Sequence, residues 1–204
     1  MSRRKIIIQV VIGGLTQFLA KAQGMPSNIK NALTKIIWEF IWEDDSSPRI
    51  TLDLLQQTTK TGGLDLLDIK ARNEAIEIMW LKAYLNFSPT RPVWATVTNT
   101  IINAAAPPAI SKKARSNMYL QFWNAPTKGP RAGLLNKDII RMMKATKKHD
   151  INLAAIRISP HLSTQLPAWY HIFSSKCSLA NAPSNCLLHQ HHVARVADLV
   201  TTSA

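Results

Sequence analysis

Apolar residues recur along the chain at intervals of three and four, the spacing that places them on one face of an α-helix. The clearest case is segment 28–42, where a broad apolar face is followed by a polar, turn-rich break. Ser27, Asp68 and Asn136 stand where helix N-caps are expected. The pattern predicts helices over residues 6–21, 28–42, 68–85, 93–103 and 137–148.

Turn residues and prolines suggest how these helices are organised. Arg49 to Leu55 favours a short strand or extended segment, and Gly62-Gly63 permits a tight turn after it. Pro107 and Pro108 close the fourth helix, and the composition changes beyond them. We therefore expect a mainly α fold, an irregular helical bundle with at most a short β-hairpin or extended segment near 49–66. Two modules are expected, a helical one at 1–104 and a basic, loop-rich one at 105–204.

Charge is distributed unevenly between the two parts of the chain. The 204 residues include 25 Lys and Arg against 12 Asp and Glu, a net charge of +13. Residues 1–80 hold ten of the basic and nine of the acidic residues, so the excess lies almost entirely beyond them. Such a basic segment indicates a polyanionic partner, nucleic acid or an anionic membrane.

The predicted helix at 137–148 has the most informative charge pattern. Lys137, Arg141, Lys144 and Lys148 follow one another at spacings of four, three and four residues, which places them on one stripe of the helix. Isoleucines and methionines lie on the other side. Such a helix can dock on a core while contacting phosphates. The alternative is an ordinary solvated basic face. Together with the flanking loops, the candidate nucleic-acid-binding residues are Lys112, Lys113, Arg115, Lys128, Arg131, Lys137, Arg141, Lys144, Lys147 and Lys148.

Aromatic residues close to these cations raise the question of base stacking. Tyr119, Phe122 and Trp123 follow Lys112, Lys113 and Arg115, and bases stack on exposed rings. The alternative is that these rings pack in the core. Core positions are expected for Trp38, Trp42, Trp80 and Trp94, and a loop-anchoring role for Trp169.

Metal and catalytic signatures are weak or missing. Cys177 and Cys186 are nine residues apart near a group of histidines, a spacing that matches no common zinc knuckle. Two cysteines make no disulfide framework, which favours a reducing compartment. Asp44-Asp45 has no flanking strand and no carboxylate cluster to share a divalent metal, and no phosphate-cradling loop or nucleophile elbow occurs. No cofactor, metal site or catalytic residue is predicted.

The N-terminus imitates a secretory signal. Arg3-Arg4-Lys5 precedes an apolar stretch from Ile6 to Ala20, and Ala20-Lys21-Ala22 resembles a cleavage site. Gln9, Thr16 and Gln17 interrupt the stretch, and the basic, cysteine-poor remainder is not typical of secreted proteins. Because the apolar run falls short of about 20 residues, a membrane-spanning helix is not expected.

The order of short motifs resembles the region after the polymerase domain in LINE-type (non-LTR) retrotransposon reverse transcriptases, especially those of fungal genomes. These motifs are Gln23-Gly24-Met25-Pro26, Phe40-Ile41-Trp42, Arg49-Ile50, Gly62-Gly63-Leu64-x-Leu66-Leu67-Asp68 and the helix from Asn73 to Leu85. Residues 6–95 carry most of the resemblance. The motifs Leu166-Pro167-Ala168-Trp169-Tyr170-His171 and Cys186-Leu187-Leu188 resemble downstream parts of such elements.

The resemblance implies that residues 6–21 correspond to the end of the thumb and that a helical connector against template and primer follows. It implies RNA or an RNA–DNA duplex and the upstream reverse transcriptase domains as partners. The polymerase aspartates are not in this sequence, so no enzymatic activity is carried over.

Three functions are consistent with these features. The first is a retroelement fragment that contacts nucleic-acid backbone without sequence preference. The second is a protein–protein packing module without activity of its own. The third is a small secreted or membrane-surface basic protein, with residues 1–22 as a targeting segment. We expect the first function, contact with nucleic-acid backbone, in the nucleus or cytoplasm and without a membrane partner.

Overall fold

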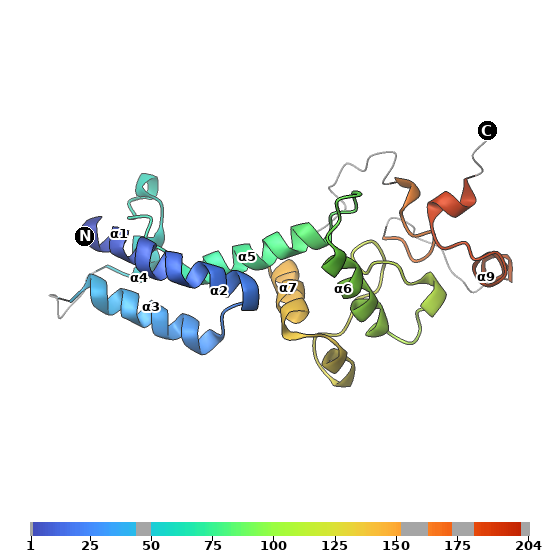
Figure 1. Cartoon of the computed structure of the whole chain (residues 1–204), viewed down its shortest axis with the longest axis horizontal. Coiled ribbons are helices and arrows are strands. Elements are labelled where there is room, and N and C mark those ends of the chain that lie inside the picture. The colour runs from blue at the N-terminus through green and yellow to red at the C-terminus, as the bar shows by residue number, and fades with distance from the viewer. Residues whose placement is uncertain (1, 44–49, 152–162, 173–181, 201–204) are drawn as a thin grey trace. The chain divides into compact units, whose positions relative to one another are not determined.

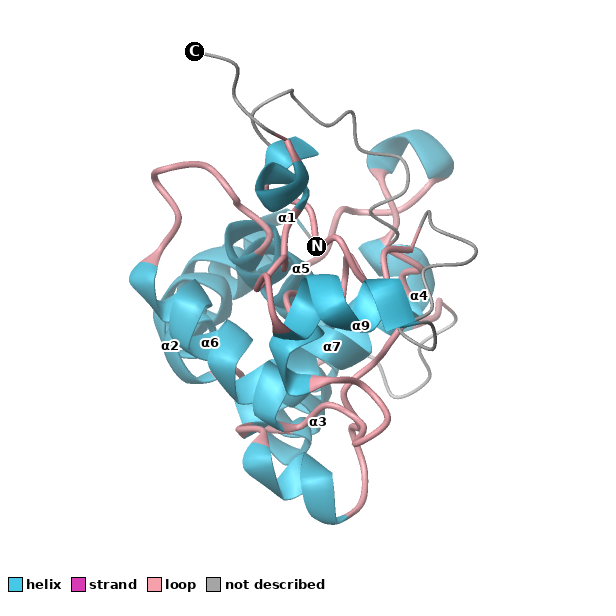
Figure 2. Ribbon diagram, turned by 90° about the vertical axis from the view of Figure 1, so that its right-hand side faces the viewer, coloured by secondary structure: helices cyan, strands magenta, loops and turns pink. Residues whose placement is uncertain are grey.

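The computed structural model describes residues 2–43, 50–151, 163–172 and 182–200 (Figure 1). Helices and loops make up these residues, and Figure 2 draws no strand among them. Within these ranges, isolated antiparallel bridges join Gln121 to His171 and Pro167 to Arg195. The expected mainly α, irregular helical fold is confirmed.

The helices follow one another along the chain as a mixture of α, 3-10 and π segments. They are α1 (Ser2–Ile7), the π-helix η1 (Ile8–Gly14), α2 (Leu15–Gln23), α3 (Ser27–Ile41), α4 (Leu52–Gln56), η2 (Thr59–Thr61), α5 (Ile69–Tyr84), α6 (Val93–Ala104), η3 (Lys112–Ala114), η4 (Pro130–Leu134), α7 (Lys137–Lys148), α9 (Ala182–His189) and η6 (Val196–Leu199).

Two of the three expected N-caps are formed. The Asp68 Oδ1 atom accepts hydrogen bonds from the backbone N–H groups of Lys70 at 2.7 Å and of Ala71 at 3.0 Å. The Asn136 Oδ1 atom accepts from the Ile139 N–H at 2.8 Å. These bonds satisfy N–H groups that a helix start leaves without a partner. Ser27 is instead the first residue of α3, preceded by Pro26 at the cap position.

Near 49–66, where a short strand, hairpin or extended segment is expected at most, the structure has a short helix followed by a loop. Residues 44–49, including Asp44-Asp45, lie outside the described residues. Leu52–Gln56 is the helix α4, and Leu55 at its end is buried. The Leu55 carbonyl accepts hydrogen bonds from the N–H groups of Leu64 and Leu66, both at 3.0 Å. The segment therefore folds back on α4 as a compact loop and not as a hairpin.

Gly62 and Gly63 make this fold-back possible. Gly62 has φ +89°, a left-handed conformation that other residues resist. A Cβ atom on Gly63 would lie 2.0 Å from the Gln57 carbonyl oxygen and 2.7 Å from that of Leu54. The loop can close onto the end of α4 only because position 63 has no side chain.

The chain divides into two compact units, a first unit of residues 1–79 and a second unit of residues 80–204. The division falls within α5. The modules expected at 1–104 and 105–204 place the boundary later in the chain, and that boundary stays a prediction.

The first unit has a core built by stripes of apolar residues on helices. Helices α1, η1 and α2 form a continuous rod, and α3 returns alongside it after the turn at Gly24 (Figure 1). The buried residues of this core are Ile8, Ala20, Met25, Ile37, Ile41, Leu55, Leu66 and Ile69.

The second unit has a core shared by helices and irregular segments. Buried residues from α5 and α6 meet buried residues from α7 and from the loop between η3 and η4. This core contains Leu81, Tyr84, Ala95, Ile102, Ala105, Ala106, Met118, Trp123, Ala125, Leu135, Ile139, Met142 and Met143. A smaller cluster of Ala114, Trp169 and Leu188 adjoins η3 and α9.

Buried polar side chains hold the loops of the second unit together. The Gln121 side chain donates to the carbonyls of Ala114 (2.8 Å) and Trp169 (2.7 Å). Its oxygen accepts from the Ser116 N–H (2.8 Å) and the Trp123 Nε1–H (2.9 Å). One amide therefore satisfies groups from three segments that have no strand or helix partner.

Trp169 anchors a loop, as expected from its position after Pro167. Its side chain is 5% exposed, and its Nε1–H donates to the Val193 carbonyl at 2.7 Å. The other tryptophans pair edge to face, Trp38 with Trp42 and Trp80 with Trp94, with ring centroids 5.8 Å and 5.0 Å apart. All four are partly buried; Trp42 packs against the core of the first unit, and Trp80 and Trp94 pack against that of the second.

Candidate nucleic-acid interface

Helix α7 separates its apolar and basic residues as the sequence predicts. Ile139, Met142 and Met143 are buried, and Ile140 packs against the same core. Lys137, Lys144, Lys147 and Lys148 are exposed on the opposite side. The helix is thus anchored by its apolar face and capped by Asn136, so its lysine side chains extend from a rigid element toward solvent.

Arg141 belongs to the same stripe but has a partner within the helix. Its guanidinium forms an ion pair with the Asp138 carboxylate, one turn earlier. The i, i+3 spacing of these two residues is a signal in the sequence that points to this pair. Because the pair is partly exposed, its contribution to stability is small, and Arg141 contributes less net charge to the surface than the neighbouring lysines.

The 3-10 helix η4 and the turn before it add two cations just before α7. Gly129, with φ +85°, turns the chain into Pro130, and Arg131 and Lys128 are both exposed. Leu135 returns to the core directly afterward. We call the exposed set Lys128, Arg131, Lys137, Lys144, Lys147 and Lys148 the α7 basic surface.

The remaining predicted cations lie elsewhere in the second unit. Lys112 and Lys113 are exposed on η3, which Figure 1 shows on the other side of α6 from α7. Arg115 points inward: its guanidinium donates to the carbonyls of Asn103 (2.9 Å), Pro107 (3.2 Å) and Ile110 (2.8 Å). Its donors hold the loop after α6, so the ten candidates do not form one continuous surface.

The aromatic residues near η3 likewise include both buried and exposed side chains. Trp123 is 3% exposed and belongs to the core, and the Tyr119 hydroxyl is 3.3 Å from the Thr146 hydroxyl on α7. Burial raises the pKa of the Tyr119 hydroxyl, as it does for Tyr84 beside it. Phe122, 59% exposed, is the member of this group that a base could reach.

Candidate metal ligands are not brought together in the described part of the chain. Among those residues no group of three or more His, Cys, Asp or Glu is close enough to hold an ion. Cys186 donates to the Gln190 side-chain oxygen at 2.9 Å, and His191 and His192 are exposed on a turn. Cys177 lies outside the described residues.

Acidic groups near the basic surface are few. In the second unit the sequence has only Asp138, Asp150 and Asp198. Asp198 caps the start of η6, and hydrogen bonds from the backbone N–H groups of Arg195 and Ala194 lower the pKa of its carboxyl. Three carboxylate side chains in the sequence of this unit cannot balance its positive charge, and one of them, Asp138, pairs with Arg141.

The described residues include one helical stretch, Arg3–Gln23, whose length and composition would suffice to cross a membrane. Signal sequences and core helices meet the same criterion, so the criterion alone assigns no location. Comparison of the chain with protein-family models, curated proteins and solved structures gives no match.

Proposed function

We propose that the second unit binds the phosphate backbone of nucleic acid without sequence preference, through the α7 basic surface. The observation that carries this proposal is the two-sided construction of α7. Ile139, Met142 and Met143 anchor one side, and the other side presents exposed lysines on a helix whose own acidic residue is Asp138. Phosphates bind such rigidly supported cations with release of counterions.

The resemblance to LINE-type reverse transcriptases supports the choice of RNA or an RNA–DNA duplex as the partner. In this proposal the chain is a non-catalytic part of such an element, and its upstream polymerase domains are the protein partners. A role as a packing module without nucleic-acid binding is the competing function, and the exposed apolar residues on the rod of α1, η1 and α2, such as Leu15 and Phe18, favour it.

The test is binding of the purified chain to a fluorescent RNA–DNA duplex across a salt series. The variant K137Q/K144Q/K147Q removes three cations of the α7 basic surface and leaves the Asp138–Arg141 pair in place. We expect weaker binding and a shallower salt slope, with the slope reduced by about one for each phosphate that the variant no longer neutralises.

A matched control removes the same charge from the first unit. Lys35, Lys60 and Lys70 are exposed there, and the variant K35Q/K60Q/K70Q should keep the salt slope of the original chain. Equally weakened binding in both variants would mean that net charge alone drives binding. A folded, monodisperse chain that does not bind the duplex would contradict the proposal and favour the packing module.

A further inference from the structure

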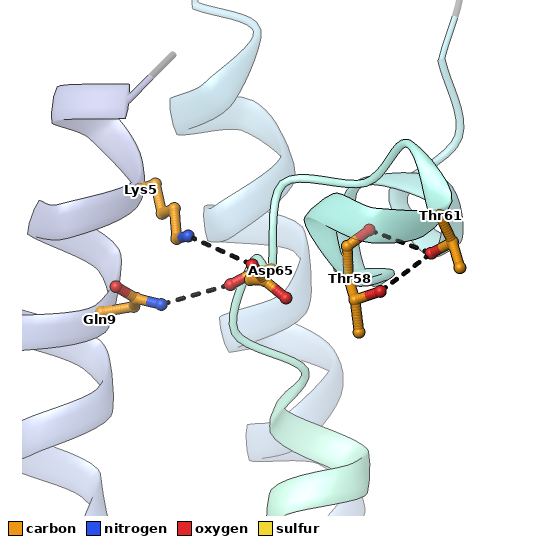
Figure 3. A network of polar contacts seen from close by, with 5 residues as sticks. All are labelled: Lys5, Gln9, Thr58, Thr61 and Asp65. Carbon is orange, nitrogen blue, oxygen red and sulfur yellow. Dashed lines mark hydrogen bonds and ion pairs between the residues drawn. The ribbon is translucent and has the colours of Figure 1, made fainter.

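One side of the rod formed by α1, η1 and α2 is fixed to the rest of the first unit. Lys5 pairs with the Asp65 carboxylate at 4.0 Å, and the Gln9 side chain donates to the Asp65 carbonyl at 3.2 Å (Figure 3). The Arg72 guanidinium donates to the Gly13 carbonyl at 2.8 Å and to the Thr16 hydroxyl. Polar contacts thus determine which side of the rod faces inward.

The other side of the rod is apolar and exposed. Its large residues each leave between 48% and 76% of their surface in solvent. Only 17% of the most apolar stretch of this helix is buried. The residues that make up this apolar rod face are Ile6, Ile7, Val10, Val11, Leu15, Phe18 and Leu19.

The π-helical segment gathers these residues onto one face. In an α-helix throughout, Leu15 would lie roughly 180° around the axis from Ile6, nine residues earlier. The turns of η1 contain more residues and therefore rotate less per residue. Across Ile8–Gly14 this difference brings Leu15, Phe18 and Leu19 back into line with Ile6 and Val10.

The apolar rod face is large enough for a stable protein interface. Its seven side chains together expose on the order of 800 Å², which is what each partner contributes to an interface of standard size. Contiguous exposed apolar patches of this size mark interaction sites. We propose that the occupant is a second copy of this chain, packed rod against rod about a twofold axis.

Charge favours a second copy over a lipid surface. Of the four basic residues on the rod, Arg4 pairs with Glu43 and Lys5 with Asp65, and these pairs weaken both the attraction to anionic lipid and the repulsion between two copies. Between Arg3 and Gln23 no acidic residue occurs. Antiparallel packing separates the two exposed Arg3 side chains by the length of the rod.

The polar contacts on the inner side also argue against a membrane-spanning rod. Hydrocarbon around the helix would require Gln9 and Thr16 to give up their partners and would leave Arg72 and Asp65 without theirs. The proposed dimer interface lies in the first unit, whereas nucleic-acid binding is proposed for the second unit. Each can therefore fail without the other.

The experiment is the sedimentation of the full chain over a wide range of concentration, beside two variants. L15S/L19S removes an exposed i, i+4 pair from the apolar rod face, and V93S/V97S removes an exposed i, i+4 pair from α6. We expect a dimer whose Kd rises on the order of a hundredfold or more in L15S/L19S and stays unchanged in V93S/V97S. Circular dichroism checks that both variants keep their helices.

Other outcomes would overturn the proposal. A chain that is monomeric at every concentration, or a dimer that V93S/V97S dissociates and L15S/L19S does not, places no second copy on the rod. Flotation of the monomer with neutral and anionic vesicles, abolished in L15S/L19S, would assign the face to a lipid surface instead.

Discussion

The two units of the chain reach a stable core by different means. In the first unit, helices supply apolar stripes, and the polar contacts between segments mostly join long side chains to backbone carbonyls. In the second unit, loops contribute as much of the core as helices do, and buried amides such as Gln121 and Asn117 lie within it. The first unit is nearly neutral, and the second carries almost all of the net positive charge.

The difference teaches where specific polar residues are needed. A helix satisfies its own backbone groups, so packing it requires only an apolar face. A buried loop leaves backbone groups without partners, and side chains must supply them. The stability of the second unit therefore depends on individual buried amide side chains. The stability of the first unit depends on a few positions, such as Gly63, where two stretches of backbone lie close together.

The largest effect is expected from Gln121→Leu. The substitution leaves the carbonyls of Ala114 and Trp169, the Ser116 N–H and the Trp123 indole N–H without their partner. We expect the free energy of unfolding of the second unit to fall by roughly 4 kcal/mol. Urea unfolding followed by hydrogen exchange of individual peptides measures this for each unit.

Gln57→Leu is the control for this change, because Gln57 is exposed in the first unit. It should alter stability by less than about 0.5 kcal/mol. If Gln121→Leu lowers the free energy of unfolding no more than Gln57→Leu does, the buried amide does not hold the loops together. The proposed difference in how the two units are stabilised would then be wrong.

A smaller effect, confined to the first unit, is expected from Gly63→Ala. The new methyl group would overlap the Gln57 carbonyl oxygen, an atom of the backbone, so the loop after α4 must move. We expect the unfolding free energy, measured by urea titration, to fall by about 3 kcal/mol.

Gly14→Ala is the contrasting substitution, because a Cβ atom added at this helical glycine would have no other atom within 4 Å. It should stabilise the first unit by about 1 kcal/mol, because alanine has the higher helix propensity. Equal effects at positions 14 and 63 would mean that close backbone approach does not limit this unit.

The smallest effect is a dependence on pH in the second unit alone. Burial lowers the pKa of the His171 imidazole, because desolvation disfavours its charged form. The stability of this unit is therefore full above the ordinary histidine pKa of about 6.5 and falls as the pH drops through the lower folded value.

Residues 1–79 contain no histidine, so the first unit should not follow this titration. Unfolding between about pH 5 and 8, the range in which histidine titrates, compares the units, and His171→Gln should flatten the profile of the second. An unchanged profile in that variant would assign the pH dependence to another group.

Much of the local structure is predictable from the sequence. Asp68 and Asn136 cap the helices that their positions indicate, and α7 buries the residues that its periodicity selects. The position of α6 follows from Pro92 before it and Pro107 after it. These features depend on residues within a turn or two of one another, where spacing alone defines the geometry.

Features that depend on distant partners are not predictable in this way. Thr51 to Gln56 has a strand-like composition, yet it forms a cap and α4, because burial of Leu55 against the first core outweighs local preference. Arg115 has the same charge as its neighbours, but carbonyls of the loop after α6 turn it inward.

The sequence by itself determined the helical class, the unequal charge of the two parts and the amphipathic character of α7, since each follows from local spacing and composition. Only the tertiary structure decided which cations reach solvent, which aromatic rings are buried and how the π segment aligns one apolar face. Those outcomes depend on packing and hydrogen bonds between residues far apart in the chain, which no local pattern contains.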